Sequence, residues 1–215
     1  ARAAILLGPA DPAATPARPR GGRHARQQRG VASPRSAAVH PARLGQRPLR
    51  NAIIAPPWVP VPPPAYGGTE AVLDNLARGL RRAGHEVLLF ATGDSTCDVP
   101  TRWVLERAAG TVATGSAAEL HHVIHAYDVV SDWGADIIHD HTLVGPVYAQ
   151  RFGVPVVTTN HGPFDGELAA LYRAIGDRVP VVAISADHAD SARGIPIAAA
   201  IHHGIDIDAF PLGDG

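Results

Sequence analysis

The sequence predicts an α/β protein with a doubly wound, mainly parallel, Rossmann-like sheet. Short apolar runs bounded by turn residues alternate with segments of helical period across residues 51–212. Most of the apolar runs are continuous rather than alternating, which is typical of strands that are covered on both faces of a parallel sheet. Strands that alternate with helices form βαβ units, and these build an open sheet with helices on both sides.

An arginine-rich tail precedes this predicted domain. Residues 1–50 contain ten arginines and one acidic residue, a net charge of +9, whereas the remaining residues carry −10 and the whole chain −1. Residues 8–50 are rich in Pro, Ala, Gly and Arg and cannot bury enough apolar surface to fold, so we expect disorder. No aromatic residues are interleaved with the arginines, so we expect no nucleic-acid partner. We therefore expect the chain to consist of a disordered tail over residues 1–50 and one domain over residues 51–212.

Seven strands and five helices are expected in the domain. The strands are Ala52–Ala55, Glu86–Thr92, a weaker one near Trp103–Leu105, Asp136–Asp140, Pro155–Asn160, Val179–Ser185 and Ala198–His202. The helices are Thr69–Ala83, Ala117–Ser131, Leu143–Phe152, Gly166–Gly176 and Ala186–Arg193.

Helical spacing predicts which side chains of two of these helices are buried. In the first helix the apolar face contains Val72, Leu73, Leu76 and Leu80, and Gly84 follows as a residue suited to end the helix. In the second the apolar stripe contains Leu120, Val123, Ile124, Tyr127 and Val130. The neighbouring His121, His122 and His125 lie off this stripe, so we expect them to be solvated.

The cysteine count and the apolar runs indicate a cytoplasmic location. The only cysteine, Cys97, can form neither an internal disulfide nor a multi-cysteine zinc site. No neighbour of Cys97 in the sequence suggests an activated thiol, so we expect it to be inert. No apolar run approaches the roughly 18 residues of a membrane span.

A glycine doublet opens the first long helix. Gly67 and Gly68 end a proline-rich loop that begins at Pro56, just after the first strand. Glycines let a backbone approach a ligand closely, and the free N–H groups of a helix N-terminus suit a phosphate. The same pair would also serve merely to turn the chain, and the residues alone favour neither interpretation. Neither GxGxxG nor GxxxxGK[ST] is present, which argues against nicotinamide and P-loop nucleotide binding.

From this loop onward the chain resembles the N-terminal domain of family 4 glycosyltransferases, which have the two-domain GT-B fold. The resemblance begins in "IAPPWVPVPPPAYGGTEAVLDNLARGLRRAGHEVLLFATGDS" and continues through "ADIIHDHTL", "GVPVVTTNHGP", "VPVVAISADHAD" and "AIHHGIDIDAF". It covers roughly residues 51–212 and none of the tail. Each motif is weak by itself, but five in the family's order are specific.

The resemblance implies roles for eight residues. Gly67 and Gly68 would face the diphosphate of the sugar donor. Glu70 and His161 would be the catalytic side chains, near the transferred sugar or the acceptor, and the cleft would be lined by Thr69, His139, His141 and Ser185. Glu70 could instead only stabilise the helix dipole, and Ser185 could only cap the following helix. Trp58 and Tyr66 could stack on a sugar or acceptor ring or simply cover the loop.

Two histidines raise the alternative of a metal site. His139 and His141 are two residues apart at a strand end and so point to one side, as metal ligands could. However, there is no HExxH motif and no third ligand at a diagnostic spacing, and the resemblance implies no metal and no cofactor. His203 stands where the family more often has Asn, which weakens any role carried over to it.

The implied activity is a retaining, metal-independent transfer of a sugar from a nucleotide-sugar to an unknown acceptor hydroxyl. The family's second domain, which holds most of the donor, is expected to lie outside these 215 residues, so we expect little turnover from this chain alone. Contact with a membrane surface is expected only if the acceptor is a lipid. Two alternatives remain: a metal-dependent hydrolase that uses His139, His141 and His161, and a non-catalytic module that binds a sugar nucleotide or a protein.

Overall fold

A computed structural model describes residues 47–110 and 116–205 of the chain. Residues 1–46, which make up most of the tail that we expect to be disordered, lie outside the described residues. The strands are β1 (Arg50–Ile54), β2 (Glu86–Phe90), β3 (Thr101–Arg102), β4 (Ile137–Asp140), β5 (Val156–Thr159), β6 (Val181–Ala183) and β7 (Ile197–Ala200). The helices are α1 (Gly68–Arg82), α2 (Ala117–Trp133), α3 (Gly145–Tyr148) with the 3-10 turn η3 (Ala149–Arg151), α4 (Gly166–Ile175) and α5 (Ala186–Ser191).

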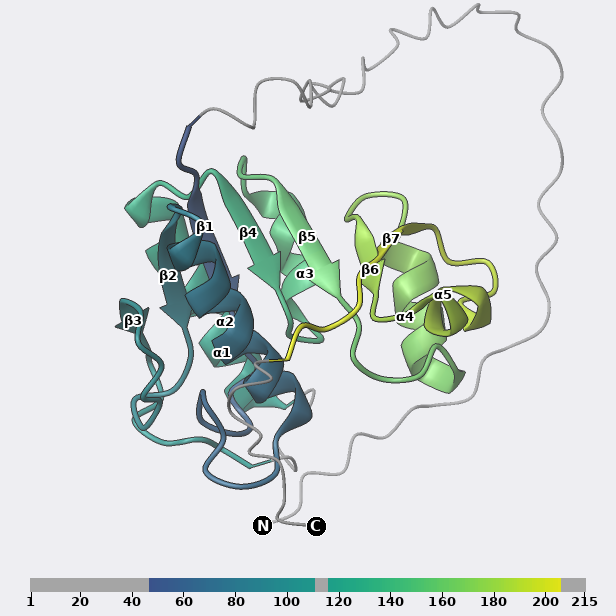
Figure 1. Ribbon diagram of the computed structural model, residues 1–215. Coiled ribbons are helices and arrows are strands. Elements are labelled where there is room, and N and C mark those ends of the chain that lie inside the picture. The colour runs from purple at the N-terminus through teal and green to yellow at the C-terminus, as the bar shows by residue number, and fades with distance from the viewer. Residues whose placement is uncertain (1–46, 111–115, 206–215) are drawn as a thin grey trace, which may run out of the picture. The chain divides into compact units, whose positions relative to one another are not determined.

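The strands form one sheet in the order β3-β2-β1-β4-β5-β6-β7, and every pairing is parallel (Figure 1). The chain therefore builds outward from β1 in one direction to β3 and then in the other direction from β4 to β7. This reversal confirms the predicted doubly wound, Rossmann-like fold. It also places a topological switch point between β1 and β4.

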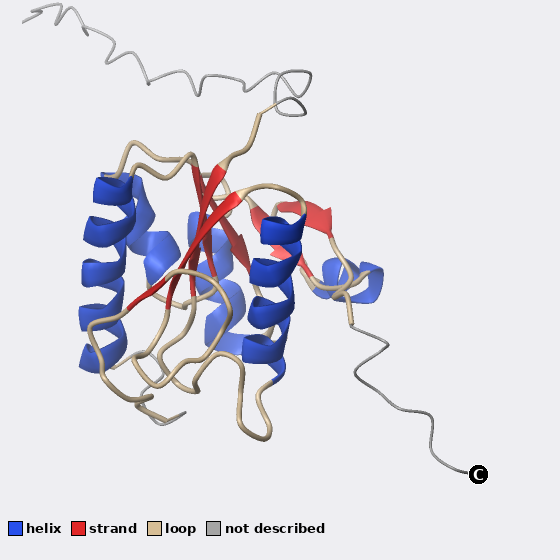
Figure 2. Cartoon of the chain, turned by 60° about the vertical axis from the view of Figure 1, so that its left-hand side comes forward, coloured by secondary structure: helices blue, strands red, loops and turns tan. Residues whose placement is uncertain are grey.

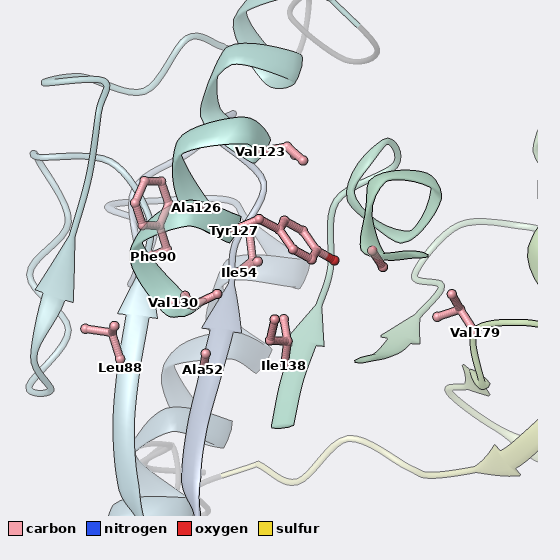
Figure 3. Close-up of a cluster of buried hydrophobic side chains, with 11 residues drawn as sticks. Ala52, Ile54, Leu88, Phe90, Val123, Ala126, Tyr127, Val130, Ile138 and Val179 are labelled. Atoms are coloured by element: carbon pink, nitrogen blue, oxygen red, sulfur yellow. The ribbon is translucent and has the colours of Figure 1, made fainter. Parts of the chain in front are cut away.

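Helices cover both faces of the sheet (Figure 2). Successive side chains of β1 enter opposite cores, because neighbouring residues of a strand point to opposite faces. Ala52 and Ile54 pack with α2, whereas Ile53 and Ala55 pack with α1. The α2 side of the core holds Phe90, Tyr127 and Ile138 among other fully buried side chains (Figure 3). A third cluster joins α4 and α5 to β6. The continuous apolar strands of the sequence follow from this double coverage.

The ends of the two long helices follow local chemistry. Gly84 follows α1 with a φ of 87°, in the left-handed region that favours glycine, as predicted for its C-terminus. Before α2, the hydroxyl oxygen of Ser116 accepts hydrogen bonds from the amides of Ala118 and Glu119. Gly134 ends α2 with a φ of 75°. Both helices therefore span nearly the predicted residues.

The predicted buried face of α2 is rotated in the structure. Leu120 is 47% exposed although the apolar stripe included it. His122, which we expected to be solvated, is fully buried: its Nε2–H donates to the carbonyl oxygen of Ala55 at 2.9 Å, and its ring meets Phe90 edge to face. The apolar pattern could not reveal this, because a carbonyl left free at the end of β1 makes a polar side chain the better partner. His121 and His125 are exposed as predicted.

The last residues of the predicted tail contact the sheet. Arg47 pairs with Asp136 at 2.7 Å, and the amide of Arg50 donates to the same carboxylate. These contacts fix the entry of β1 beside that of β4. Among the described residues, no helix is both long enough and apolar enough to cross a lipid bilayer.

Candidate functional site

The carboxyl ends of β1, β4 and β5 meet at one edge of the sheet, next to the switch point. β1 lies between β2 and β4, and β4 pairs in turn with β5. Open α/β sheets bind ligands in the crevice at this position. The loops that follow these three strands carry the glycine doublet, His141 and His161, so segments far apart in the sequence are brought to the same edge.

The proline-rich loop after β1 is anchored to the loop after β2. The amide of Val61 donates to the hydroxyl of Ser95, and its carbonyl oxygen accepts from the amides of Thr96 and Cys97. Val61 itself is fully buried. The loop is therefore held in place before any ligand arrives, and this fixes the start of α1.

The two glycines at the start of α1 have different surroundings. A Cβ added to Gly67 would lie 2.6 Å from Cβ of Pro63 and 2.9 Å from Oε2 of Glu70, so only glycine fits there. A Cβ added to Gly68 would meet no atom within 4 Å. Within the described part of the chain, the amides of Gly68 and Thr69 donate no hydrogen bond, and no side chain caps this end. Gly67 is thus required by packing, whereas Gly68 faces open space with a free amide.

Glu70 lies beneath this helix start and is 3% exposed. Burial raises the pKa of its carboxyl, and a hydrogen bond from its own amide partly opposes that rise. A buried carboxylate costs more free energy than a solvated one, and the positive end of the helix favours its negative charge. Glu70 is therefore a poorly solvated acid beside the free amides of Gly68 and Thr69.

Five of the predicted residues line one hollow of about 410 Å³. We call it the donor crevice, after the role that the sequence resemblance implies for Gly67 and Gly68. Its lining residues are Trp58, Val59, Tyr66, Gly67, Gly68, Thr69, Glu70, His161, Ile184 and His203. No arginine or lysine lines it within the described residues. Tyr66 is 94% exposed, and Nε1 of Trp58 is buried without a hydrogen-bond partner. The crevice thus combines two free amides, an acid, two imidazoles and the aromatic rings of a tryptophan and a tyrosine.

Four imidazoles form a row from the sheet to the crevice. His139 and His141 lie 4.1 Å apart between ring centroids, His141 and His161 5.1 Å apart, and His203 stacks on His161 at 5.3 Å. Nδ1 of His141 lies 2.8 Å from Nε2 of His161, and Nε2 of His139 lies 2.8 Å from Oγ1 of Thr159. His139 and His141 point to the same side, as predicted, but they line a second hollow of about 730 Å³ and not the donor crevice.

Burial keeps this row neutral. It lowers the pKa of His139 to about 4 and that of His161 to about 3, and it holds the pKa of His141 well below its ordinary value. The neighbouring imidazoles contribute a second, smaller effect at His141 and His161, because each disfavours a positive charge on the next. Near neutral pH these side chains can donate or accept one hydrogen bond per nitrogen, but they carry no charge.

Ser185 caps the helix that follows it, which is one of the two roles predicted for it. It precedes α5, and its hydroxyl oxygen accepts from the amide of His188 at 3.0 Å. Ser185 lines neither hollow, and Ile184 takes its expected place on the wall of the donor crevice. The hydroxyl of Ser185 thus satisfies an amide at the start of α5 that would otherwise be free.

The metal-site and reactive-thiol alternatives gain no support. Among the described residues, no group of three or more His, Cys, Asp or Glu side chains is arranged to hold a metal ion. His139 and His141 are occupied by Thr159 and His161, so a hydrolase built on them is not favoured. Cys97 is buried, and this raises the pKa of its thiol to about 12, in agreement with the predicted inertness.

Sequence reasoning missed two features of the site. His203 lines both hollows and stacks on His161, although its departure from the family pattern argued against a role. Asp140, between the two strand-end histidines, is fully buried and accepts hydrogen bonds from Tyr127 Oη at 2.7 Å and from the amide and hydroxyl of Thr142 at 2.8 Å each. The motif His139–Asp140–His141 could have indicated the burial of Asp140. Neighbouring strand residues point to opposite faces of the sheet, so Asp140 must point to the face opposite that of the two histidines.

Comparison with known proteins supports the same family. The family model described as Glycosyltransferase Family 4 matches residues 66–209. Sucrose-phosphate synthase from Thermosynechococcus elongatus is similar in structure, with a TM-score of 0.55 and 16% identity over 75% of this chain and 50% of that chain. HepE from Anabaena, in complex with UDP and glucose, is also similar, with a TM-score of 0.54 and 15% identity over 77% of this chain and 47% of that chain. A shorter chain of the synthase has a TM-score of 0.50 and 18% identity over 74% of this chain and 92% of that chain.

These structural likenesses show the fold alone, because the identities are low. This chain spans about half the length of the first two solved structures. No curated protein matches its sequence significantly.

Proposed function

Because this chain belongs to glycosyltransferase family 4, we propose that it is part of an enzyme that moves a sugar from a nucleotide-sugar to an acceptor hydroxyl. The observation that carries the proposal is the donor crevice at the switch point, where Gly68, Thr69, Glu70 and His161 line one space. The structure of HepE, a similar protein, contains UDP and glucose, which supports a nucleotide-sugar as the donor.

The amides of Gly68 and Thr69 are the groups that would meet the diphosphate. Both are free within the described residues, both lie at the positive end of a 15-residue helix, and Gly68 has no atom near its missing Cβ. Free amides at a helix N-terminus hydrogen-bond phosphate oxygens and favour negative charge. A phosphate group could therefore approach the backbone amide of Gly68 closely.

Glu70 and His161 would act on the sugar rather than on the diphosphate. A carboxylate repels phosphate, so hydrogen bonding to sugar hydroxyls suits Glu70 better. A neutral imidazole at His161 can form a hydrogen bond with a hydroxyl in the same crevice. Trp58 and Tyr66 line the same crevice and carry aromatic rings that could stack on the acceptor.

The charge of the leaving group calls for a second set of residues. A nucleoside diphosphate leaves with at least two negative charges, whose stabilisation needs donors and cations held in place. No arginine or lysine of the described chain lines the crevice. We therefore propose that a second domain supplies them and that this chain alone turns over little substrate.

The reaction we propose retains the anomeric configuration and uses no metal. The bond between the anomeric carbon and the diphosphate oxygen breaks, the acceptor oxygen bonds to that carbon on the same face, and the leaving phosphate takes the acceptor proton. Product analysis with the full-length protein tests this step. Inverted product would reject it, and so would activity that a chelator abolishes.

Gly68→Ala in the full-length protein tests the crevice most simply. The added methyl group meets no protein atom, so the fold should persist, but it should enter the space that the diphosphate needs. We expect nucleotide-sugar binding, measured by calorimetry, to weaken by about tenfold or more, a loss of roughly 1.4 kcal/mol or more. A matched control is Gly153→Ala, where the new Cβ also meets no atom and which lines neither hollow. Equal affinity in the two variants would reject the proposed diphosphate site.

A further inference from the structure

The hydrogen bond between His141 and His161 links a buried side chain to one that lines the donor crevice. His141 follows β4 and is 6% exposed, and its Nδ1 lies 2.8 Å from Nε2 of His161, which follows β5. Burial keeps both rings neutral, with pKa values below their ordinary range. In a neutral pair one nitrogen must donate and the other must accept. The direction of this bond therefore fixes where each ring carries its proton.

The surroundings of His141 indicate the direction. Nε2 of His141 is buried and has no hydrogen-bond partner. A proton on that nitrogen would leave an N–H group buried without an acceptor, which is rare and unfavourable in proteins. His141 is therefore better protonated at Nδ1, from which it donates to Nε2 of His161. His161 must then carry its own proton on Nδ1.

Nδ1 of His161 is the nitrogen that remains available to a ligand. It forms no hydrogen bond within the described part of the chain and is not among the buried atoms that lack a partner. His161 lines the donor crevice together with Gly67, Gly68 and Glu70, and it does not line the larger hollow. An Nδ1–H group at this position is a hydrogen-bond donor that remains free for a ligand in the crevice.

We propose that His141 is a positioning residue that locks His161 in its Nδ1–H tautomer, so that His161 donates a hydrogen bond to an oxygen of the bound sugar donor. This inference rests on the proposed function for the identity of the ligand, but not for the tautomer. In this arrangement His161 donates a hydrogen bond to an oxygen of the sugar donor and is not a base, because its other nitrogen already accepts the proton of His141.

The tautomer is measured directly on the full-length wild-type protein, without ligand. Long-range ¹H–¹⁵N correlation spectra of protein labelled with ¹⁵N-histidine distinguish a protonated ring nitrogen from an unprotonated one. At pH 7 we expect protonated Nδ1 and unprotonated Nε2 in both His141 and His161. A proton on Nε2 of either ring overturns the inference, and this readout needs no variant to fold.

Two variants test the consequence for binding. His141→Asn keeps an N–H donor near the position of Nδ1, whereas His141→Leu removes it. We expect His141→Leu to lose the fixed tautomer of His161 and to weaken nucleotide-sugar binding about tenfold, while His141→Asn stays within about threefold of wild type. Equal losses in both variants, with His161 still protonated at Nδ1, would contradict the positioning role.

The two proposals fail in distinguishable ways. If wild-type protein binds no nucleotide-sugar, the proposed function fails whatever the histidine spectra show. If it binds nucleotide-sugar but His161 is protonated at Nε2, only the inference about His141 fails.

Discussion

The buried imidazole of His122 makes the stability of this fold depend on pH, and the structure gives the size of the effect. His122 is fully buried in α2 and donates to the carbonyl oxygen of Ala55. Burial lowers the pKa of its imidazole from the ordinary 6.5 to about 4. Between these values the unfolded chain binds a proton that the folded chain does not. Because the unfolded state binds more protons, the free energy of unfolding falls as the pH decreases through this window.

The expected contribution of His122 between pH 7.5 and pH 5 is about 2 kcal/mol, from the linkage of a group whose pKa is 6.5 unfolded and about 4 folded. His122→Gln should remove it, since the amide of Gln can still donate to Ala55 but does not titrate. Loss of the edge-to-face contact with Phe90 should lower stability by roughly 0.5–1.5 kcal/mol at all pH values. Urea unfolding of wild type and variant at several pH values measures both effects.

His121→Gln is the matched control, because His121 is the neighbouring residue, receives the same substitution and is exposed. Its unfolding free energy should follow that of wild type across the pH range. Asp140, whose pKa burial raises to about 6, acts in the opposite direction, but it is common to all three proteins and cancels in the comparison. Parallel stability curves for His122→Gln and wild type would refute the reasoning.

Two further predictions concern buried groups near the site. Tyr127→Phe removes a donor from the fully buried carboxyl of Asp140 and should lower the free energy of unfolding by about 1–3 kcal/mol, measured by urea unfolding; a change below about 0.5 kcal/mol would contradict the buried hydrogen bond. Cys97, with its thiol pKa raised to about 12, should react with a thiol reagent at pH 8 much more slowly in the folded chain than in urea, and equal rates would contradict its burial.

The sheet could be predicted from sequence because its strands carry a strong, local signal. Most apolar runs are continuous, since Ala52–Ala55 and the other central strands enter cores on both faces of the sheet. The predicted strand near Trp103–Leu105 is instead the two-residue β3 at Thr101–Arg102. An edge strand that short has little apolar pattern, so its position could not be read accurately.

The candidate site was only partly predictable, because its polar contacts depend on tertiary structure. The resemblance to the family implied the grouping of Gly67, Gly68, Glu70 and His161, and these residues line one hollow in the structure. The burial of His122 depends on a carbonyl at the end of β1, which lies 67 residues away in the sequence.

Ser185 and His203 show the same limit at single side chains. The sequence favoured neither the helix cap nor the cleft for Ser185, and the cap became visible only from the distance between its hydroxyl oxygen and the amide of His188. The stacking of His203 on His161 joins residues from different loops and has no local pattern.

The most direct test of the central claim is the structure of the full-length protein with a bound nucleoside diphosphate. The account predicts a phosphate oxygen within about 3 Å of the amide nitrogen of Gly68, at the start of α1. A diphosphate bound elsewhere, with the amides of Gly68 and Thr69 still facing solvent, would contradict it.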